Sequence, residues 1–346
     1  MNNRYLIAGD EHINSCHEFS KPTKDGLSVR LQQHLLHARQ ISQRILDYKP
    51  SCFVSLGDIF HTHTTIGVDS LITAKRWFDT IYAACRKVGA HFYIVVGNHD
   101  YYSLTSNLHA CEIFKGIEGV TVVDEFLDTP QGVFIPYMED FRVVEALVNG
   151  VSDKESKVCF SHINFLGAGF SPTIKDTTSK NLPDWFKDFR KVYAGHIHMP
   201  QVLGKNIKFP GSLNDFSFKS PRADRGLILF DSGTGDEDFI QIISPDFLTF
   251  NDDNIQDVGL GSGDFYANIN LSSKMVLEAH GYSEEWLKEN TAGYYINYDY
   301  QRIKKGEALS ESVQERSFQE ILSEYVSSSI EDPKDHIKYA QSRLLK

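Results

Sequence analysis

Five short motifs between residues 10 and 198 place carboxylate, imidazole and amide side chains close together in the chain. They are, in order, Asp10-Glu11-His12, Gly57-Asp58, Gly97-Asn98-His99-Asp100, Ser161-His162 and Gly195-His196-Ile197-His198. Residues i and i+2 of an extended or turning segment can point to one side, so Asp-x-His and His-x-His pairs can reach one ion. These ligand types together suit manganese, iron, zinc or cobalt better than calcium. The set therefore predicts a metal site.

Each motif by itself is a weak signal, because Gly-Asp and Ser-His pairs occur by chance and a lone histidine is more often structural than a ligand. All five in this order, each at the end of an apolar run, are far more specific. The sequence contains no Gly-x-Ser-x-Gly elbow for a nucleophilic serine.

Alternating strand and helix patterns position these motifs. Apolar runs predict strands at Tyr5–Ala8, Cys52–Leu56 and His91–Val96, and helical apolar spacing predicts helices at Val29–Tyr48 and Ser70–Val88. The alternation indicates an α/β fold in which helices cover a mixed sheet. Loops at the carboxyl ends of such strands converge on one crevice. Later strands are predicted at Val120–Val123, Val133–Ile135, Val158–Ser161, Val192–Ala194, Lys208–Phe209 and Leu227–Phe230.

Composition bounds the class of protein. The chain has 346 residues, 41% hydrophobic and 23% charged, which is ordinary for a globular protein with one large and one smaller domain. No apolar run is long enough to span a bilayer, and the N-terminus lacks a signal-peptide pattern, so we expect a cytoplasmic protein. The five cysteines are scattered without a Cys-x-x-Cys pair, which argues against a disulfide framework and a thiolate zinc site.

The texture of the sequence changes near Pro245. Asn251–Asp264 is rich in Asp, Asn and Gly, as in a loop or linker. We expect three parts: a large domain at 1–244, a small α+β unit at 245–305 and a helical tail at 306–346. The elements expected after Pro245 are a strand near Tyr266–Leu271, a helix near Ser283–Asn290, a strand near Gly293–Tyr298, and tail helices at Ser312–Ser327 and Pro333–Leu345.

The ordered motifs resemble those of the calcineurin-like metallophosphoesterase superfamily, whose fold is a sandwich of mixed β-sheets flanked by helices. The resemblance implies two divalent metal ions, with manganese expected and magnesium, iron or zinc as alternatives. Asp58 would bridge the ions, and His99 would lie beside the phosphate without binding metal. The implied ligands are Asp10, His12, Asp58 and His198 for the first ion and Asp58, Asn98, His162 and His196 for the second.

Such a site has a well-defined chemistry. Two adjacent ions can lower the pKa of a water molecule and stabilise the charge that develops during in-line attack on a phosphate. His99 would stabilise the transition state or give a proton to the leaving oxygen.

Two further stretches resemble the double-strand-break repair nucleases, whose bacterial member is the SbcD subunit. Gly57-Asp58-Ile59-Phe60-His61 is similar to their second motif, where protein phosphatases of the superfamily read Gly-Asp-x-Val-Asp-Arg-Gly. Gly195–Gln201, Phe209–Ser212 and Ser217-Phe218 are similar to the later SbcD pattern. Phage recombination nuclease subunits resemble the chain most of all. The resemblance implies that His61 assists His99, whereas His63 matches no motif and is expected to be exposed.

The resemblance implies a metal-dependent DNA exonuclease or endonuclease subunit that works with an SbcC-type coiled-coil ATPase in DNA repair, recombination or replication. The ATPase would dock on the tail at 306–346, the unit at 245–305 would be a small DNA-engaging cap, and helices such as Ser70–Val88 would form a homodimer. A net charge of −11 is unusual for a nucleic-acid enzyme, so a local basic patch or the partner must attract the phosphates. If a phage encodes the chain, the host cytoplasm is the expected location.

Two alternatives stay open. A phosphomonoesterase or a cyclic-nucleotide phosphodiesterase could use the same dinuclear site, although the missing Asp-Arg-Gly argues against a protein phosphatase and the C-terminal extension argues against a minimal cyclic-nucleotide enzyme. A non-catalytic subunit that binds DNA ends is less favoured, because every implied ligand and His99 are present.

The chain also departs from the family pattern. Ile13-Asn14 follows the first motif where family members usually carry Leu-Gly, and Glu11 precedes His12, which puts the local loop shape in doubt. The remaining histidines are expected to be structural or exposed: His17, His34, His37, His91, His109, His280 and His336. Basic candidates for phosphate contacts, with a solvated surface as the default, are Lys21, Lys24, Lys219, Arg222 and Arg225.

Overall fold

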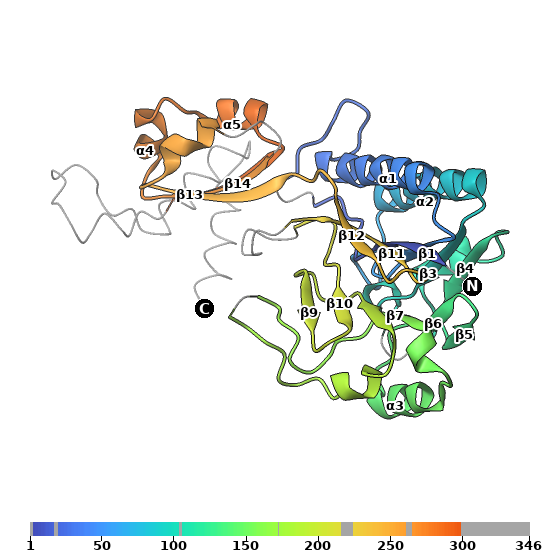
Figure 1. Cartoon of the computed structure of the whole chain (residues 1–346). Coiled ribbons are helices and arrows are strands. Elements are labelled where there is room, and N and C mark those ends of the chain that lie inside the picture. The colour runs from blue at the N-terminus through green and yellow to red at the C-terminus, as the bar shows by residue number, and fades with distance from the viewer. Residues whose placement is uncertain are drawn as a thin grey trace, which may run out of the picture. The chain divides into compact units, whose positions relative to one another are not determined.

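The computed structural model describes residues 3–16, 20–103, 106–171, 173–215, 224–260 and 265–298. The described chain forms two six-stranded mixed sheets and one three-stranded parallel sheet (Figure 1). The predicted α/β architecture of mixed sheets flanked by helices, followed by a small α+β unit, is confirmed. The predicted tail helices, Ser312–Ser327 and Pro333–Leu345, lie outside the described residues, and the bounds of the three parts stay predictions.

The first sheet has the strand order β12-β11-β1-β2-β3-β4. Strands β1 to β4 run parallel, whereas β11 pairs antiparallel with β1, and β12 pairs antiparallel with β11. The carboxyl ends of β1, β2 and β3 therefore meet at one edge, directly before the first three motifs. The strands are β1 (Arg4–Ala8), β2 (Cys52–Ser55), β3 (His91–Val95), β4 (Val120–Val123), β11 (Gly226–Asp231) and β12 (Glu237–Gln241).

The second sheet has the order β5-β6-β7-β8-β10-β9, with β6, β7, β8 and β10 parallel and the two outer strands antiparallel to their neighbours. The ends of β7 and β8 carry the last two motifs. The strands are β5 (Leu127–Thr129), β6 (Gly132–Ile135), β7 (Val158–Ser161), β8 (Lys191–Ala194), β9 (Gln201–Leu203) and β10 (Ile207–Phe209).

A buried aromatic cluster joins the two large sheets. The rings of Tyr5 and Phe160 lie 5.1 Å apart, and those of Tyr93 and Phe134 lie 4.2 Å apart, each pair linking one sheet to the other. Full burial of a large apolar side chain stabilises a fold by about 1.5–3 kcal/mol. This cluster fixes the two strand edges relative to each other, so the motifs of both sheets can share one site.

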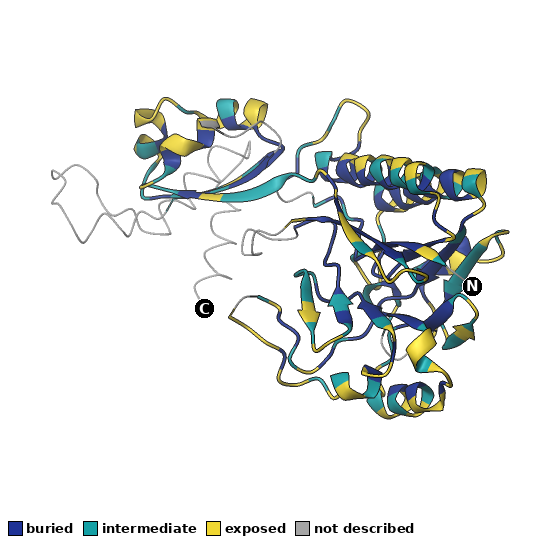
Figure 2. Ribbon diagram, in the orientation of Figure 1, coloured by how far each residue is buried: buried dark blue, intermediate teal, exposed yellow. Residues whose placement is uncertain are grey.

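Two long helices cover the outer face of the first sheet. α1 (Val29–Tyr48) begins where the Ser28 hydroxyl accepts a hydrogen bond from the Leu31 amide, and it ends at Lys49 in the left-handed region. Its bounds match the prediction, whereas α2 (Val68–Val88) begins two residues earlier than predicted. Figure 2 shows their exposed residues on the outward side.

Among the described residues, no helix combines the length and hydropathy needed to cross a bilayer.

The prediction of a loop over Asn251–Asp264 was wrong for part of that stretch. The 3₁₀ helix η5 (Ile255–Leu260) lies inside it, because Ile255 and Val258, three residues apart, are fully buried against Phe250 and its neighbours. This small unit contains β13 (Asp246–Asn251), β14 (Phe265–Leu271), α4 (Lys274–Ala279), α5 (Glu284–Asn290) and β15 (Gly293–Tyr298).

The sequence analysis also missed several short elements. Three of them, β5, β9 and β12, are edge strands of 3, 3 and 5 residues, which is too short for a clear alternation of apolar and polar residues. Helix α3 (Phe141–Gly150) packs on the second sheet through Val144 and Val148, and α4 is only six residues long.

Candidate metal centre

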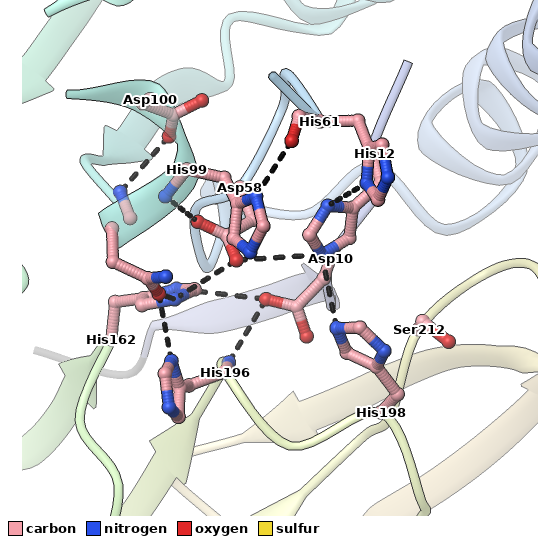
Figure 3. A network of polar contacts seen from close by, with 12 residues as sticks. Asp10, His12, Asp58, His61, His99, Asp100, His162, His196, His198 and Ser212 are labelled. Carbon is pink, nitrogen blue, oxygen red and sulfur yellow. Dashed lines mark hydrogen bonds and ion pairs between the residues drawn. The ribbon is translucent and has the colours of Figure 1, made fainter. Parts of the chain in front are cut away.

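All nine site residues predicted from the sequence lie in one cluster at the carboxyl edge of the two large sheets. Figure 3 labels each of them except Asn98. By strand, they are Asp10 and His12 after β1, Asp58 and His61 after β2, Asn98 and His99 after β3, His162 after β7, and His196 and His198 after β8. Asp10 and His198, the first and last of these residues, are 188 positions apart in the chain. They meet because the carboxyl ends of five strands lie at the same edge.

Asp58 stands at the middle of the cluster. Its Oδ2 atom lies 3.4 Å from Nε2 of His12 on one side and 3.3 Å from Nε2 of His162 on the other. His12 Nε2 also lies 3.0 Å from Nε2 of His198. A single carboxylate oxygen therefore faces two groups of ligand atoms, one with His12 and His198 and one with His162 and His196.

Asn98 completes the second group. Its Oδ1 atom lies 3.0 Å from His162 Nε2 and 2.7 Å from His196 Nδ1, so one amide oxygen and two ring nitrogens converge with Asp58. We call Asp10, His12, Asp58 and His198 the first cluster, and Asp58, Asn98, His162 and His196 the second cluster.

Asp10 supplies the best test of whether these residues fit a cation. Its Oδ1 accepts a hydrogen bond of 2.9 Å from the His196 amide. Its Oδ2 is buried and has no hydrogen-bond partner among the described residues. An unsatisfied buried acceptor is costly, and a bound cation would satisfy it. The Asp and His side chains are thus compatible with a divalent metal.

The backbone around the ligands is strained. His12, Asp58 and His196 have φ values of 51°, 49° and 76°, in the left-handed region that side chains rarely adopt. Such strain of about 1–3 kcal/mol per residue persists where surrounding structure enforces it, and it concentrates at functional sites. Gly195 permits the close approach of two loops, because a Cβ there would lie 2.6 Å from the Leu56 carbonyl oxygen.

Burial and neighbouring charges set the protonation of the site. Burial lowers the pKa of His196 to about 3 and that of His198 to about 4, so both rings are neutral with a lone pair available at neutral pH. Burial also opposes charge on His162, but Asp58 and Asp10 outweigh it and raise the pKa of His162 to about 9. Burial raises the pKa of Asp10 to about 7. The site therefore favours positive charge beside Asp58, as a proton or as a cation.

His99 lies beside the clusters and belongs to neither. Its amide donates to Asp58 Oδ1 at 2.8 Å, and its Nδ1 donates to the His61 carbonyl oxygen at 2.7 Å. A carbonyl can only accept, so Nδ1 carries a proton and Nε2 is the atom that can gain or lose one. This fixed orientation suits a general acid or an electrostatic stabiliser.

His61 and His63 flank His99. The His61 ring stacks on His99 at 5.5 Å, and the His63 ring stacks at 4.7 Å. His61 Nδ1 also lies 3.2 Å from His12 Nδ1. His63 is exposed, as expected, but its contact with His99 was missed. The alternating His61-Thr62-His63 pattern was the available signal, since i and i+2 can face one side.

Two buried charged residues support the loops, and the sequence analysis gave neither this role. Asp100 accepts hydrogen bonds from the Phe60 amide at 3.0 Å and the Gly97 amide at 2.9 Å, which ties the loop after β2 to the loop after β3. Arg225 was expected on a solvated surface, which was wrong: it is buried and donates to the His198 carbonyl oxygen at 2.8 Å. Lys219 and Arg222 lie outside the described residues.

Sequence comparisons place the chain near phosphoesterases. No protein-family model matches it. Putative phosphoesterase 078R of Invertebrate iridescent virus 3 is 32% identical over 186 residues, covering 50% of this chain and 51% of the relative. Putative phosphoesterase 244L of Invertebrate iridescent virus 6 is 31% identical over 182 residues, covering 50% of this chain and 61% of that protein. Exonuclease subunit 1 of Enterobacteria phage T4 is 24% identical over 198 residues, covering 54% and 55%. These matches span about half to three fifths of the relatives' lengths.

Two solved structures share a partial likeness. NAD nucleotidase of Haemophilus influenzae has a TM-score of 0.36 and 11% identity, covering 70% of this chain and 49% of that chain. The 5'-nucleotidase precursor of Thermus thermophilus has a TM-score of 0.35 and 12% identity, covering 70% and 55%.

Proposed function

We propose that this chain is a DNA nuclease subunit that hydrolyses phosphodiester bonds with two divalent metal ions. The observation that carries the proposal is the position of Asp58 Oδ2, which lies within 3.4 Å of His12 Nε2 and 3.3 Å of His162 Nε2. One oxygen shared by two ligand groups is the arrangement that a pair of bridged cations requires. The unsatisfied Oδ2 of Asp10 supports it.

The first cluster would hold one ion and the second cluster the other, with Asp58 common to both. Carboxylate, imidazole and amide oxygen ligands together suit several divalent metals. Manganese is proposed because the superfamily that the motifs resemble implies it, with magnesium, iron or zinc as alternatives. When bound, the ions would supply Lewis acidity, which activates water and neutralises charge on the phosphate oxygens.

The protein's own residues would complete the reaction. Asp58 holds both clusters together, and its Oδ1 fixes the backbone of His99. His99, oriented through the His61 carbonyl, would give a proton from Nε2 to the leaving oxygen. His61 would keep that ring in place by stacking on it. Burial of Asp10, His12, Asp58 and His162 keeps bulk water away from the ligand atoms, which strengthens electrostatic stabilisation.

DNA is the proposed substrate for two reasons. The stretch Gly57–His61 resembles the repair nucleases, and a protein named exonuclease subunit matches 54% of the chain. That relative is named a subunit, which supports the further proposal of a partner, an SbcC-type ATPase docked on residues 306–346, and of a homodimer. A partner would also offset the net charge of −11, which repels a DNA backbone.

Hydrolysis assays with manganese test the proposal. We expect the protein to shorten end-labelled linear duplex DNA, and to hydrolyse bis-(p-nitrophenyl) phosphate, a diester, faster than p-nitrophenyl phosphate, a monoester. The DNA assay is run with and without a candidate ATPase. Hydrolysis of the monoester alone, with DNA and diester intact in both arms, would contradict the assignment to nucleases and favour a phosphomonoesterase.

A further inference from the structure

A second group of buried titratable side chains lies behind the metal centre and takes no part in the function proposed above. Glu11 sits between Asp10 and His12, and its side chain contacts the inner face of α1, where His34 and His37 are fully buried. Glu11 Oε1 lies 2.6 Å from His34 Nδ1 and 3.0 Å from His37 Nδ1. The side-chain nitrogen Nδ2 of Asn214 lies 3.4 Å from both of these ring nitrogens.

Oε2 of Glu11, like Oδ2 of Asp10, is buried without a partner among the described residues, but the contacts of Oε1 and of the two rings indicate hydrogen bonds rather than a third ion. Distances of 2.6 and 3.0 Å are those of a ring N–H that donates to a carboxylate. If both Nδ1 atoms bound an ion, both Nε2 atoms would have to carry protons, and neither Nε2 has a partner among the described residues. Metal-binding histidines almost always donate from their second nitrogen. With Nδ1 as donor, each Nε2 is only an unpaired acceptor.

The two contacts meet at one atom of Glu11. Two ring N–H groups that converge on one buried carboxylate oxygen form a strong attachment. The attachment joins the loop after β1 to helix α1, 23 and 26 residues further along the chain.

Backbone hydrogen bonds hold the loop after β1 on both sides of Glu11. The Asp10 carbonyl accepts a hydrogen bond of 3.1 Å from the Leu213 amide, and the amides of His12 and Ile13 donate to carbonyl oxygens after β2 at 2.8 and 2.7 Å. Between these backbone contacts, the Glu11 side chain adds a contact to α1, while its two neighbours contribute to the first cluster. His12 has a φ of 51°, so its position depends on such restraints.

We propose that Glu11 is a positioning residue: through its hydrogen bonds to His34 and His37 it sets where Asp10 and His12 present their ligand atoms, and so sets the affinity of the first cluster for its ion. The proposal rests on the proposed two-ion function. Glu11 in the first motif, which departs from the family pattern, would then be the residue that anchors the loop.

The experiment measures manganese binding in four proteins: wild type, Glu11→Ala, Glu11→Gln and Ile45→Ala. Ile45 is fully buried on the same helix, so its replacement destabilises α1 without touching Glu11. The readouts are the manganese concentration that gives half-maximal hydrolysis of bis-(p-nitrophenyl) phosphate, the ions retained after gel filtration, and the melting temperature. Glutamine has nearly the size of glutamate and keeps one acceptor oxygen. The Glu11→Gln variant therefore tests the effect of Glu11 on manganese binding if Glu11→Ala does not fold.

We expect Glu11→Ala to raise the half-maximal manganese concentration about 10- to 100-fold and to retain one ion where wild type retains two. The half-maximal manganese concentration of Glu11→Gln should lie between those of wild type and Glu11→Ala. Ile45→Ala should melt at a lower temperature but keep the wild-type manganese requirement.

Three results would overturn the inference. One is an unchanged manganese requirement in both Glu11 variants. Another is an equal rise in Ile45→Ala, which would show a general loss of stability. The third is a wild type that retains three ions and loses one on double replacement of His34 and His37 by Ala, because Glu11 would then be a ligand itself. A wild type that binds no manganese and hydrolyses no diester would instead contradict the proposed function.

Discussion

Replacement of Asp58 by Asn is expected to lower kcat/KM for phosphodiester hydrolysis by about a thousandfold or more. Asp58 Oδ2 faces His12 and His162 at once, and an amide in its place loses the negative charge that would hold two cations. Cations of this kind contribute several kcal/mol of transition-state stabilisation, and each 1.36 kcal/mol is worth a factor of ten in rate. The measurement is steady-state hydrolysis of bis-(p-nitrophenyl) phosphate together with manganese content.

The matched control is Asp79→Asn, because Asp79 is an exposed aspartate on α2 that pairs with Lys75 of the same helix. It should keep wild-type rates, since exposed ion pairs contribute little. Retention of a tenth or more of the activity by Asp58→Asn, with two ions still bound, would show that Asp58 does not bridge them.

Replacement of His99 by Ala is expected to lower kcat by about a hundredfold to ten-thousandfold while manganese content stays unchanged. The backbone amide of His99 makes its hydrogen bond to Asp58, and alanine keeps that amide, so the ligand atoms keep their places. If the ring protonates the leaving oxygen, the loss must be greater for DNA, which has a poor leaving group, than for a nitrophenyl ester. Comparison of the two substrates in the same variant measures this directly.

His91→Ala is the control for this prediction. His91 begins β3, the strand that leads to His99, and its ring contacts Thr121 on the neighbouring strand at 2.8 Å. It should leave both rates near wild type. An equal loss of rate on both substrates in His99→Ala, accompanied by loss of manganese, would make His99 a metal ligand instead of an acid.

The sequence indicates where the candidate ligands gather, because every one of them lies within a few residues of a strand end. Apolar runs locate β1, β2, β3, β7 and β8, and parallel pairing brings their ends to one edge. The bounds of α1 follow from local signals, since its cap at Ser28 and its buried apolar spacing are both visible in the chain. Local chemistry and local periodicity therefore decide most of the architecture.

Contacts that link distant side chains were not predictable in this way. Glu11 occupies the variable position of the first motif, and nothing near it in sequence indicates that His34 and His37 would face it from a helix. The sequence does not show that Arg225 is buried, because its burial depends on contacts with Asp215 and with the turn after β8. Such pairings are set by how α1 and the sheets pack, which single-residue spacing does not record.

The most direct test of the account is the anomalous difference density of crystals grown with manganese. The account predicts two peaks of similar height, both next to Asp58 Oδ2, one bordered by His12 and His198 and the other by His162 and His196. A single peak, or two peaks of which only one touches Asp58, would contradict it.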